Sequence, residues 1–279
     1  MNPTVDNLLG EAAHDPADAV EQRREAQILL GHVLGVSRAW LAAHGDEKAG
    51  ASAAAIFRDL LRRRQTGEPV AYLVGRREFY GLDFQVTPDV LIPRADTETL
   101  VDAALEKLTT GISHDVLDLG TGSGCVAIAI AHERPAARVT AVEVSTAALS
   151  VARDNAAAIG VQVDFLRGRW FETLAENRFD LIVSNPPYVA TGDPHLRQGD
   201  LRFEPATALT AGDDGLNDIR IIVKQAPAHL RPGGWLLFEH GYDQAGRCRD
   251  LLQDAGFGEL FSRVDLAGWP RVAGGRLLT

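Results

Sequence analysis

The chain has 279 residues, of which 46% are hydrophobic and 24% charged, the composition of an ordinary globular protein of one or two domains. This composition excludes a disordered tail, a collagen-like repeat and a low-complexity array. With 28 basic and 38 acidic residues the net charge is −10, which argues against a protein that binds a phosphate backbone by charge alone.

Cysteine content and hydropathy indicate the cellular compartment of the protein. Cys125 and Cys248 lie far apart and form no Cys-x-x-Cys pair, so neither a disulfide framework nor a structural zinc site is expected. The eight histidines show no metal-ligand spacing, and no metal is expected. No apolar run reaches the ~18–20 residues of a membrane span, and residues 1–10 lack the basic residues of a secretory signal. We therefore expect a soluble, cytoplasmic protein that binds no membrane.

Residues 1–75 have a helical pattern and are predicted to form an N-terminal domain. Apolar residues recur at spacings near three and four up to Gly35, which can end an amphipathic helix, and Ser37 can cap the next one. A further helix over residues 53–64 ends in Arg62-Arg63-Arg64. These arginines either complement the helix dipole or form a partner-binding patch.

The segment Gly67-Glu68-Pro69 breaks the helical pattern. Apolar and polar residues then alternate from Ala71 to Leu91 around Gly81, which predicts a β-hairpin. We assign this hairpin as a linker over residues 76–92.

From residue 93 onward, short apolar runs alternate with helical segments, and residues 93–279 are predicted to form a second domain. The predicted strands are residues 116–119, 139–142, 163–166, 181–183 and 235–238, with two more within 259–278. The predicted helices are residues 125–132, 146–159, 219–230 and 244–255. Strands that alternate with helices specify a largely parallel sheet covered on both faces.

A glycine-rich segment, Asp118-Leu119-Gly120-Thr121-Gly122-Ser123-Gly124, follows the first of these strands and opens a helix. Glycines let the backbone turn sharply there and let a ligand approach it closely. The dinucleotide fingerprint has its third glycine five positions after the first, and here that position is Cys125. The segment therefore indicates a nucleoside cofactor other than NAD.

Two acids flank this loop, and each has two interpretations. Glu143 ends the next strand, where it can accept the two hydroxyls of a ribose. As an acid ahead of Ser145, it can instead favour the N-terminus of the following helix. Asp118 either reaches the bound cofactor or only braces the loop.

The strand at 179–184 leads into Asn185-Pro186-Pro187-Tyr188 at its carboxyl end, where ligands bind in open parallel sheets. As a bare tetrapeptide this is also a turn sequence. An amide or aromatic amine is a poor nucleophile because its lone pair is delocalised, so methylation requires that its N–H groups be held. The Asn185 side-chain oxygen can accept one N–H, the Pro186 carbonyl can accept the other, and Tyr188 can stack on the planar group. Such positioning lowers the barrier, and the acceptors stabilise the positive charge that reaches nitrogen.

The tetrapeptide and the Gly-x-Gly-x-Gly loop together resemble the S-adenosylmethionine-dependent methyltransferases that act on planar NH2 groups. Further segments resemble one family among them, the HemK/PrmC-type peptide chain release factor N5-glutamine methyltransferases. Those segments are residues 25–30, 67–75, 78–81, 90–98, 203–205, 212–215 and 268–276. The resemblance covers nearly the whole chain.

The resemblance implies a Rossmann-like class I methyltransferase fold with a seven-stranded, mostly parallel sheet, a small N-terminal helical domain and a β-hairpin linker. It implies transfer of a methyl group from S-adenosylmethionine, which leaves S-adenosylhomocysteine, to the glutamine of the Gly-Gly-Gln motif of release factors. By the same resemblance, this modification would modulate translation termination. The N-terminal helices would recognise the release factor, no direct contact with nucleic acid is expected, and the chain is expected to be a monomer.

Site residues follow from the same resemblance. The cofactor would be held by Asp118, Gly120, Thr121, Gly122, Ser123, Gly124, Glu143, Trp170 and Asn185. The substrate pocket would be formed by Asn185, Pro186, Pro187 and Tyr188, with Asn185, Pro186 and Tyr188 as the catalytic residues and 92–94 at its border. Two positions depart from the family pattern. Glu143 stands where Asp is more usual, and Arg169, next to the Trp170 that would pack beside adenine, stands where an acid is common.

Other functions stay open at this point. The nearest is a ribosomal-protein glutamine N5-methyltransferase, although residues 92–98 resemble the release-factor branch. A nucleic-acid amino-methyltransferase for adenine N6 or guanine N2 needs a target-recognition domain and a basic surface, whereas residues 76–279 carry 20 basic and 28 acidic residues. A non-catalytic binding module would not require an intact loop and tetrapeptide.

Residues 193–215 form a long irregular stretch, which predicts a substrate-binding lid. Within it, Glu204 can brace the loop over the site. His240 follows another strand and is expected to be a structural histidine.

Overall fold

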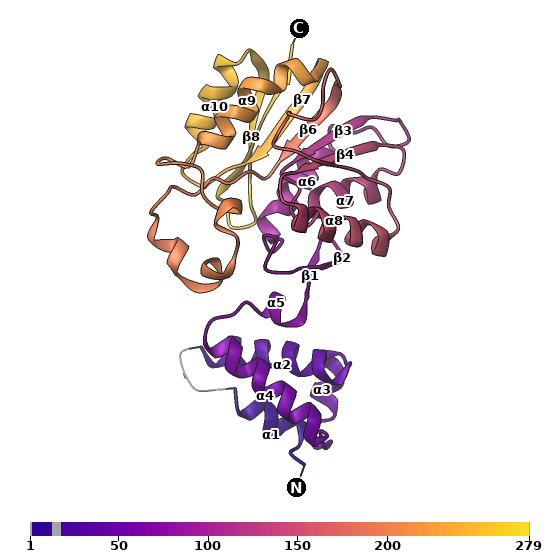
Figure 1. Cartoon of the computed structure of the whole chain (residues 1–279), viewed down its shortest axis with the longest axis vertical. Helices are drawn as coiled ribbons and strands as arrows, with labels where there is room; N and C mark the ends of the chain where they lie inside the picture. Colours follow the sequence, from indigo (N-terminus) through magenta and orange to yellow (C-terminus); the bar gives the residue numbers. More distant parts are fainter. Residues whose placement is uncertain (1, 13–17, 279) are drawn as a thin grey trace. The chain divides into compact units, whose positions relative to one another are not determined.

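A computed structural model of the chain describes residues 2–12 and 18–278. Two compact units are present (Figure 1). The first consists of Met1–Gly75 with Gln198–Phe203, and the second of Arg76–Arg197 with Glu204–Thr279. The hairpin that the sequence analysis assigned to a linker thus groups with the second unit.

The first unit is helical, as predicted. Its helices are α1 (Val5–Gly10), α2 (Ala19–Leu34), α3 (Arg38–Ala43), α4 (Ala51–Gln65) and α5 (Val70–Val74), with the 3-10 helix η3 (Gly199–Phe203). Gly35 ends α2 in the left-handed conformation, at φ 67°, and the Ser37 hydroxyl caps α3 by accepting from the Trp40 amide at 3.1 Å. Both predicted helix boundaries are confirmed. The buried core contains Leu8, Leu29, Leu30, Leu41 and Phe57.

The arginine run at the end of α4 has carboxylate partners within the first unit. Arg62 pairs with Asp59 and Arg63 with Glu68. Arg64 lies 2.8 Å from Glu25 and 3.1 Å from Asp200. Because these partners offset the three positive charges, the run presents less positive potential than its sequence indicates.

The expected alternation from Ala71 is wrong for its first residues. Val70–Val74 is the short helix α5, with Pro69 at its N-cap and Gly75 in the left-handed conformation at its C-cap, φ 72°. These two flanking residues terminate a helical turn that the apolar alternation alone does not reveal. The predicted hairpin follows as β1 (Arg76–Phe79) and β2 (Leu82–Gln85), antiparallel across Tyr80 and Gly81. Both turn residues have positive φ, as a tight two-residue hairpin turn requires.

The second unit is built around a seven-stranded sheet in the order β5-β4-β3-β6-β7-β9-β8. Neighbours from β5 to β7 are parallel, and β9 is antiparallel to both β7 and β8. The predicted seven-stranded, mostly parallel sheet is confirmed. The strands are β3 (Asp115–Leu119), β4 (Arg138–Glu143), β5 (Asp164–Arg167), β6 (Phe179–Ser184), β7 (Leu230–Glu239), β8 (Phe257–Val264) and β9 (Pro270–Leu277).

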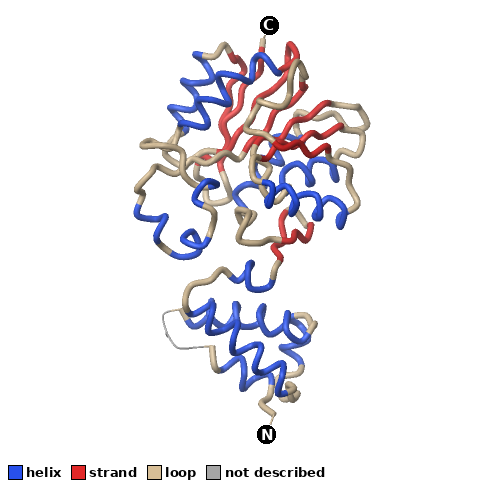
Figure 2. The backbone as a smooth tube through the Cα atoms, in the orientation of Figure 1, coloured by secondary structure: helices blue, strands red, loops and turns tan. Residues whose placement is uncertain are grey.

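Helices cover both faces of this sheet (Figure 2). One hydrophobic cluster joins the sheet to α6 and α7, and the other joins it to α9 and α10. Alternate residues of a strand enter opposite clusters, as Val116 and Leu117 do in β3, because successive side chains point to opposite faces. The helices of this unit are α6 (Glu98–Leu105), α7 (Cys125–Glu133), α8 (Thr146–Ile159), α9 (Asn217–His229) and α10 (Ala245–Asp254).

The order of the strands reverses beside β3. The chain runs outward from β3 to β4 and β5, then returns to place β6 on the other side of β3. In open α/β sheets this switch point leaves a crevice at the carboxyl ends of the two central strands. The glycine-rich loop leaves β3 at this edge, and the Asn185 segment leaves β6 there.

Candidate active site

The two predicted motifs begin side by side. Leu119, the last residue of β3, is in register with Ser184, the last residue of β6, and the Ser184 hydroxyl donates to the Leu119 carbonyl at 2.8 Å. This hydrogen bond ties the two strand ends together below the point where the loops diverge. The glycine loop and the Asn185 segment therefore face one crevice.

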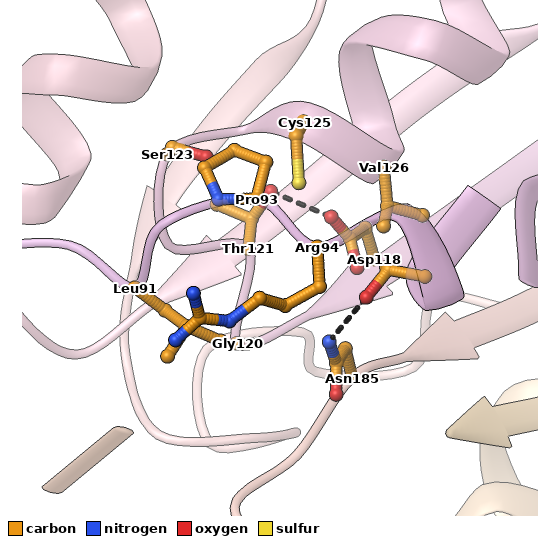
Figure 3. A pocket seen from close by; sticks show the side chains of 11 residues that line it. Leu91, Pro93, Arg94, Asp118, Gly120, Thr121, Ser123, Cys125, Val126 and Asn185 are labelled. Atoms are coloured by element: carbon orange, nitrogen blue, oxygen red, sulfur yellow. Dashed lines mark hydrogen bonds between the residues drawn. The ribbon is translucent and has the colours of Figure 1, made fainter. Parts of the chain in front are cut away.

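A pocket lies in this crevice (Figure 3). It brings together the glycine loop, Asn185 and a third segment that precedes α6. The lining residues are Leu91, Pro93, Arg94, Thr97, Asp118, Gly120, Thr121, Ser123, Cys125, Val126 and Asn185. Pro93 and Arg94 belong to the segment expected to border the pocket.

The backbone of the glycine loop has a conformation that residues other than glycine adopt only with strain. Gly120 and Gly124 have φ of 72° and 84°, in the left-handed region. A Cβ at 120 would lie 3.2 Å from the Trp170 ring, and one at 124 would lie 2.8 Å from Ile128 Cδ1. The loop is therefore closely packed at Gly120 and Gly124, and it lines the pocket through Gly120, Thr121 and Ser123.

Asp118 is buried and braces the loop. Its Oδ2 accepts from the Thr121 hydroxyl at 2.6 Å, and it also lines the pocket. Burial raises the pKa of Asp118 to about 7, against the lowering effect of the Thr121 hydrogen bond. The Thr121 contact supports the interpretation that Asp118 braces the loop, and contact between Asp118 and the cofactor stays a prediction.

Glu143 connects the loop to the next helix. Its Oε2 accepts from the Gly122 amide and its Oε1 from the Ser145 amide, each at 2.9 Å. Ser145 is the N-cap of α8, so this carboxylate is the helix-terminal acid of the second interpretation. A carboxylate has about four acceptor positions, and the two that remain can still take ribose hydroxyls. Ribose binding by Glu143 stays a prediction.

Trp170 contacts the glycine loop, whereas its neighbour Arg169 forms an ion pair outside the loop. Arg169 lies 3.3 Å from Asp218 in the first turn of α9. Trp170 has φ 51°, and its buried Nε1 has no hydrogen-bond partner within the described part of the chain. A buried donor without an acceptor is unusual in a folded protein, and here it lies beside the predicted cofactor loop.

The Asn185 segment is held by side chains from distant parts of the second unit. The Asn185 Nδ2 donates to the Thr97 hydroxyl at 3.1 Å. The Tyr188 hydroxyl donates to Glu239 Oε1 at 2.9 Å, and the Tyr188 carbonyl accepts from Gln244 at 3.0 Å. Burial raises the pKa of both Tyr188 and Glu239.

The sequence analysis missed Thr97, Glu239 and Gln244. Glu239 ends β7, so the rule that located Glu143, an acid at the carboxyl end of a central strand, would have found it. Thr97 and Gln244 carry no such signal, because their importance comes from contacts with residues 88 and 56 positions away.

Glu204 contacts the segment at the border of the pocket, and its predicted role in bracing the loop over the site stays a prediction. Its buried carboxylate accepts from the Ile92 amide at 3.2 Å and pairs with Arg94. His240 is fully buried, and its Nδ1 contacts the Gly241 carbonyl at 2.8 Å. Its Nε2 has no hydrogen-bond partner among the described residues, so its structural role stays a prediction. Burial raises the pKa of Cys125 to about 12, so its thiol is no nucleophile near neutral pH.

Two family models match the chain, the PrmC N-terminal domain over residues 7–75 and the methyltransferase small domain over residues 96–207. Curated relatives match nearly its whole length. The release factor glutamine methyltransferase of Xylella fastidiosa (strain Temecula1) is 53% identical, covering 91% of this chain and 93% of its own. That of Bordetella pertussis (strain Tohama I) is also 53% identical, covering 94% and 97%.

The chain belongs to the release factor glutamine methyltransferase family. A more distant member, from Salmonella typhimurium (strain LT2), is 43% identical over 96% of this chain and 97% of its own. These matches confirm the family predicted from the sequence motifs and, with it, a methyltransferase as the class of enzyme.

Solved structures support the fold assignment. A methyltransferase from Pyrococcus furiosus has a TM-score of 0.55 at 18% identity, covering 79% of this chain and 99% of its own. The 16S rRNA N2 G1207 methyltransferase of Thermus thermophilus, solved with AdoMet and guanosine, has a TM-score of 0.52 at 24% identity, covering 72% and 49%. The predicted class I methyltransferase fold is therefore confirmed.

Two further observations concern the described residues, 2–12 and 18–278. Their His, Cys, Asp and Glu side chains form no group of three or more that could hold a metal ion. Within the same ranges, no helix combines the length and apolar character that a membrane crossing requires.

Proposed function

We propose that this protein transfers a methyl group from S-adenosylmethionine to the side-chain amide nitrogen, N5, of the glutamine in the Gly-Gly-Gln motif of peptide chain release factors. The relatives named release factor glutamine methyltransferase support this substrate. The observation that carries the proposal is the position of Asn185 beside the glycine loop, where two acceptors can face a planar NH2 group.

The residues of the crevice fit S-adenosylmethionine. The left-handed glycine backbone at 120, 122 and 124 suits close approach of the ligand, and Asp118, Gly120, Thr121 and Ser123 line the same pocket. Trp170 packs on the loop with an unpartnered indole N–H. These residues, with Thr121, Ser123 and Glu143, would hold the cofactor, and Asn185 would touch it from the other side. When bound, the cofactor supplies an electrophilic methyl group and leaves as S-adenosylhomocysteine.

Residues of the chain orient the glutamine amide that receives the methyl group. The Asn185 Oδ1 accepts one N–H of the glutamine amide and the Pro186 carbonyl accepts the other, which directs the nitrogen lone pair at the methyl. Pro187 and Tyr188 complete the wall of the pocket. As the nitrogen takes up the methyl group it would gain positive charge, which the Asn185 oxygen and the Pro186 carbonyl would stabilise. The methylated nitrogen then loses one proton to water, so no dedicated base is required.

Charge and domain organisation support a protein substrate. The net charge of −10 is unfavourable for nucleic acid, whose binding depends on Lys and Arg contacts to phosphate. The helical first unit, which matches the PrmC N-terminal domain, would recognise the folded release factor. The protein would act as a monomer in the cytoplasm, where a reducing environment keeps Cys125 and Cys248 as free thiols.

A competition assay tests this proposal. The purified protein is incubated with labelled S-adenosylmethionine in the presence of release factor, total RNA and DNA, and the label in each fraction is measured. We expect label in the release factor, with little dependence on salt concentration. Label in nucleic acid, falling steeply as salt rises, would contradict the substrate and retain the fold and the role of Asn185.

A further inference from the structure

The role of Asn185 depends on which end of its side-chain amide faces the substrate. The glutamine amide to be methylated presents N–H donors, so it needs the Asn185 oxygen and is repelled by the Asn185 NH2 group. In the structure the Nδ2 end is occupied, because it donates to Thr97 Oγ1 at 3.1 Å. The Thr97 side chain is buried, in the 3-10 helix Ala95–Thr97 that precedes α6.

Thr97 alone cannot fix this orientation. A hydroxyl both donates and accepts hydrogen bonds, so Thr97 could equally donate to an Asn185 amide turned the other way. The direction is set only if the single Thr97 proton has another acceptor. The Thr97 hydroxyl can then only accept a hydrogen bond from Asn185, so the NH2 end of the Asn185 amide must face it.

Glu239 is placed to be that acceptor. It ends β7 and is 1% exposed, and its Oε1 accepts from the Tyr188 hydroxyl at 2.9 Å. Its Oε2 is buried with no hydrogen-bond partner of ordinary geometry among the described residues. Burial raises the pKa of Glu239, and the neighbouring hydroxyl of Thr97 opposes this rise. A buried acceptor without a donor is therefore next to a hydroxyl with one proton.

We infer that Glu239 and Thr97 are positioning residues that fix the orientation of the Asn185 amide. The Glu239 carboxylate accepts the Thr97 proton, Thr97 accepts from Asn185 Nδ2, and Asn185 Oδ1 is left facing the substrate. The same carboxylate holds the Tyr188 hydroxyl, so one buried acid fixes both sides of the acceptor pocket. This inference rests on the proposed role of Asn185 in holding an NH2 group.

Three isosteric or conservative variants test the chain of hydrogen bonds. Thr97→Val removes the hydroxyl at nearly constant volume, and Thr97→Ser restores it. Glu239→Gln puts an NH2 donor where the carboxylate was, which lets Thr97 donate to Asn185 and turns the amide over. We expect Thr97→Val and Glu239→Gln each to lower kcat with release factor by about 10²-fold, the scale of a misplaced reacting group. We expect Thr97→Ser to retain most of the activity. The kcat of the double variant Thr97→Val/Glu239→Gln should be no lower than that of Thr97→Val alone.

Binding and stability measurements separate positioning from a structural role. The Kd for S-adenosylmethionine, measured by calorimetry, and the Tm should change little in all three variants. Thr140→Val, in β4 and away from the pocket, is the matched control and should keep the wild-type kcat. In 15N-labelled protein, the Asn185 Nδ2H2 resonances, identified by their absence in Asn185→Ala, should shift in Glu239→Gln as in Thr97→Val.

Several outcomes would overturn the inference. These are wild-type kcat and unshifted resonances in Thr97→Val, a Thr97→Ser variant as slow as Thr97→Val, or additive losses in the double variant. The wild-type protein in the same assay reports separately on the proposed function. If it labels nucleic acid and not release factor, the same variants are compared on that NH2 acceptor, and the resonance shifts test the hydrogen bonds without any substrate.

Discussion

The two sides of the active site are built in different ways. On the cofactor side, Asp118 and Thr121 lie three positions apart, and Glu143 bonds to Gly122 and Ser145, so the contacts span at most two neighbouring strand ends. On the acceptor side, Asn185 and Tyr188 are held by Thr97 and Glu239, which are 88 and 51 positions away. A short sequence motif is sufficient to form the cofactor side, whereas the acceptor side forms only when distant segments come together in the completed sheet. Substitutions on the acceptor side should therefore leave cofactor binding largely unchanged.

The largest effect is expected at the acceptor side. Asn185→Ala removes the oxygen that holds the substrate amide, and turnover should fall by about 10²–10³-fold or more, the effect of deleting one preorganised hydrogen-bonding group. Because the cofactor loop is braced by other residues, the Kd for S-adenosylmethionine should change little. Steady-state kinetics and calorimetry on the same preparation check both. Undiminished turnover would contradict the role of Asn185.

The reciprocal change is Gly124→Ala on the cofactor side. Gly124 has φ 84°, and a Cβ there would lie 2.8 Å from Ile128 Cδ1 and 3.2 Å from Ala152 Cβ. The free energy of unfolding should fall by about 1–3 kcal/mol, and cofactor binding should weaken. Gly246→Ala is the control, since a Cβ at 246 in α10 meets nothing within 4 Å. That variant should be up to about 1 kcal/mol more stable in chemical denaturation.

A smaller effect is expected at the border of the pocket. Glu204→Gln removes the charge that pairs with Arg94 and leaves an amide that can still accept from Ile92. The KM for release factor should rise about tenfold, the scale of one hydrogen bond to a charged group, while kcat and the Kd for the cofactor stay near wild type. Glu259→Gln, which disrupts an exposed ion pair with Arg276, should leave all three parameters unchanged. A cofactor defect in Glu204→Gln would place this residue on the other side of the site.

A pH dependence of stability is also expected from Asp118. Burial raises its pKa from 3.8 to about 7, so the folded state binds a proton that the unfolded chain releases near pH 4. The stabilisation is present below about pH 4 and is lost as pH rises through about 7. Asp118→Asn, without cofactor, should therefore gain stability relative to wild type over this range. Denaturation at several pH values measures the difference, and a constant difference would mean that Asp118 is ionised throughout.

The same contrast explains what could be predicted from the sequence. The loop from Asp118 to Gly124 and the segment from Asn185 to Tyr188 are contiguous, and the strand pattern places both at one edge of the sheet. Thr97 and Gln244 could not be found, because they lie at the N-termini of α6 and α10, and their partners are set by how these helices pack against the sheet. The short helix α5 was also missed, since five residues between Pro69 and Gly75 are too few for a helical period to appear.

The central claim is tested most directly by mass spectrometry of a release factor. The release factor is first incubated with S-adenosylmethionine and either the wild-type protein or the Asn185→Ala variant. The account predicts one added CH2 on the glutamine of the Gly-Gly-Gln motif with the wild-type protein and almost none with the variant. A modification on another residue, or equal modification by both proteins, would contradict it.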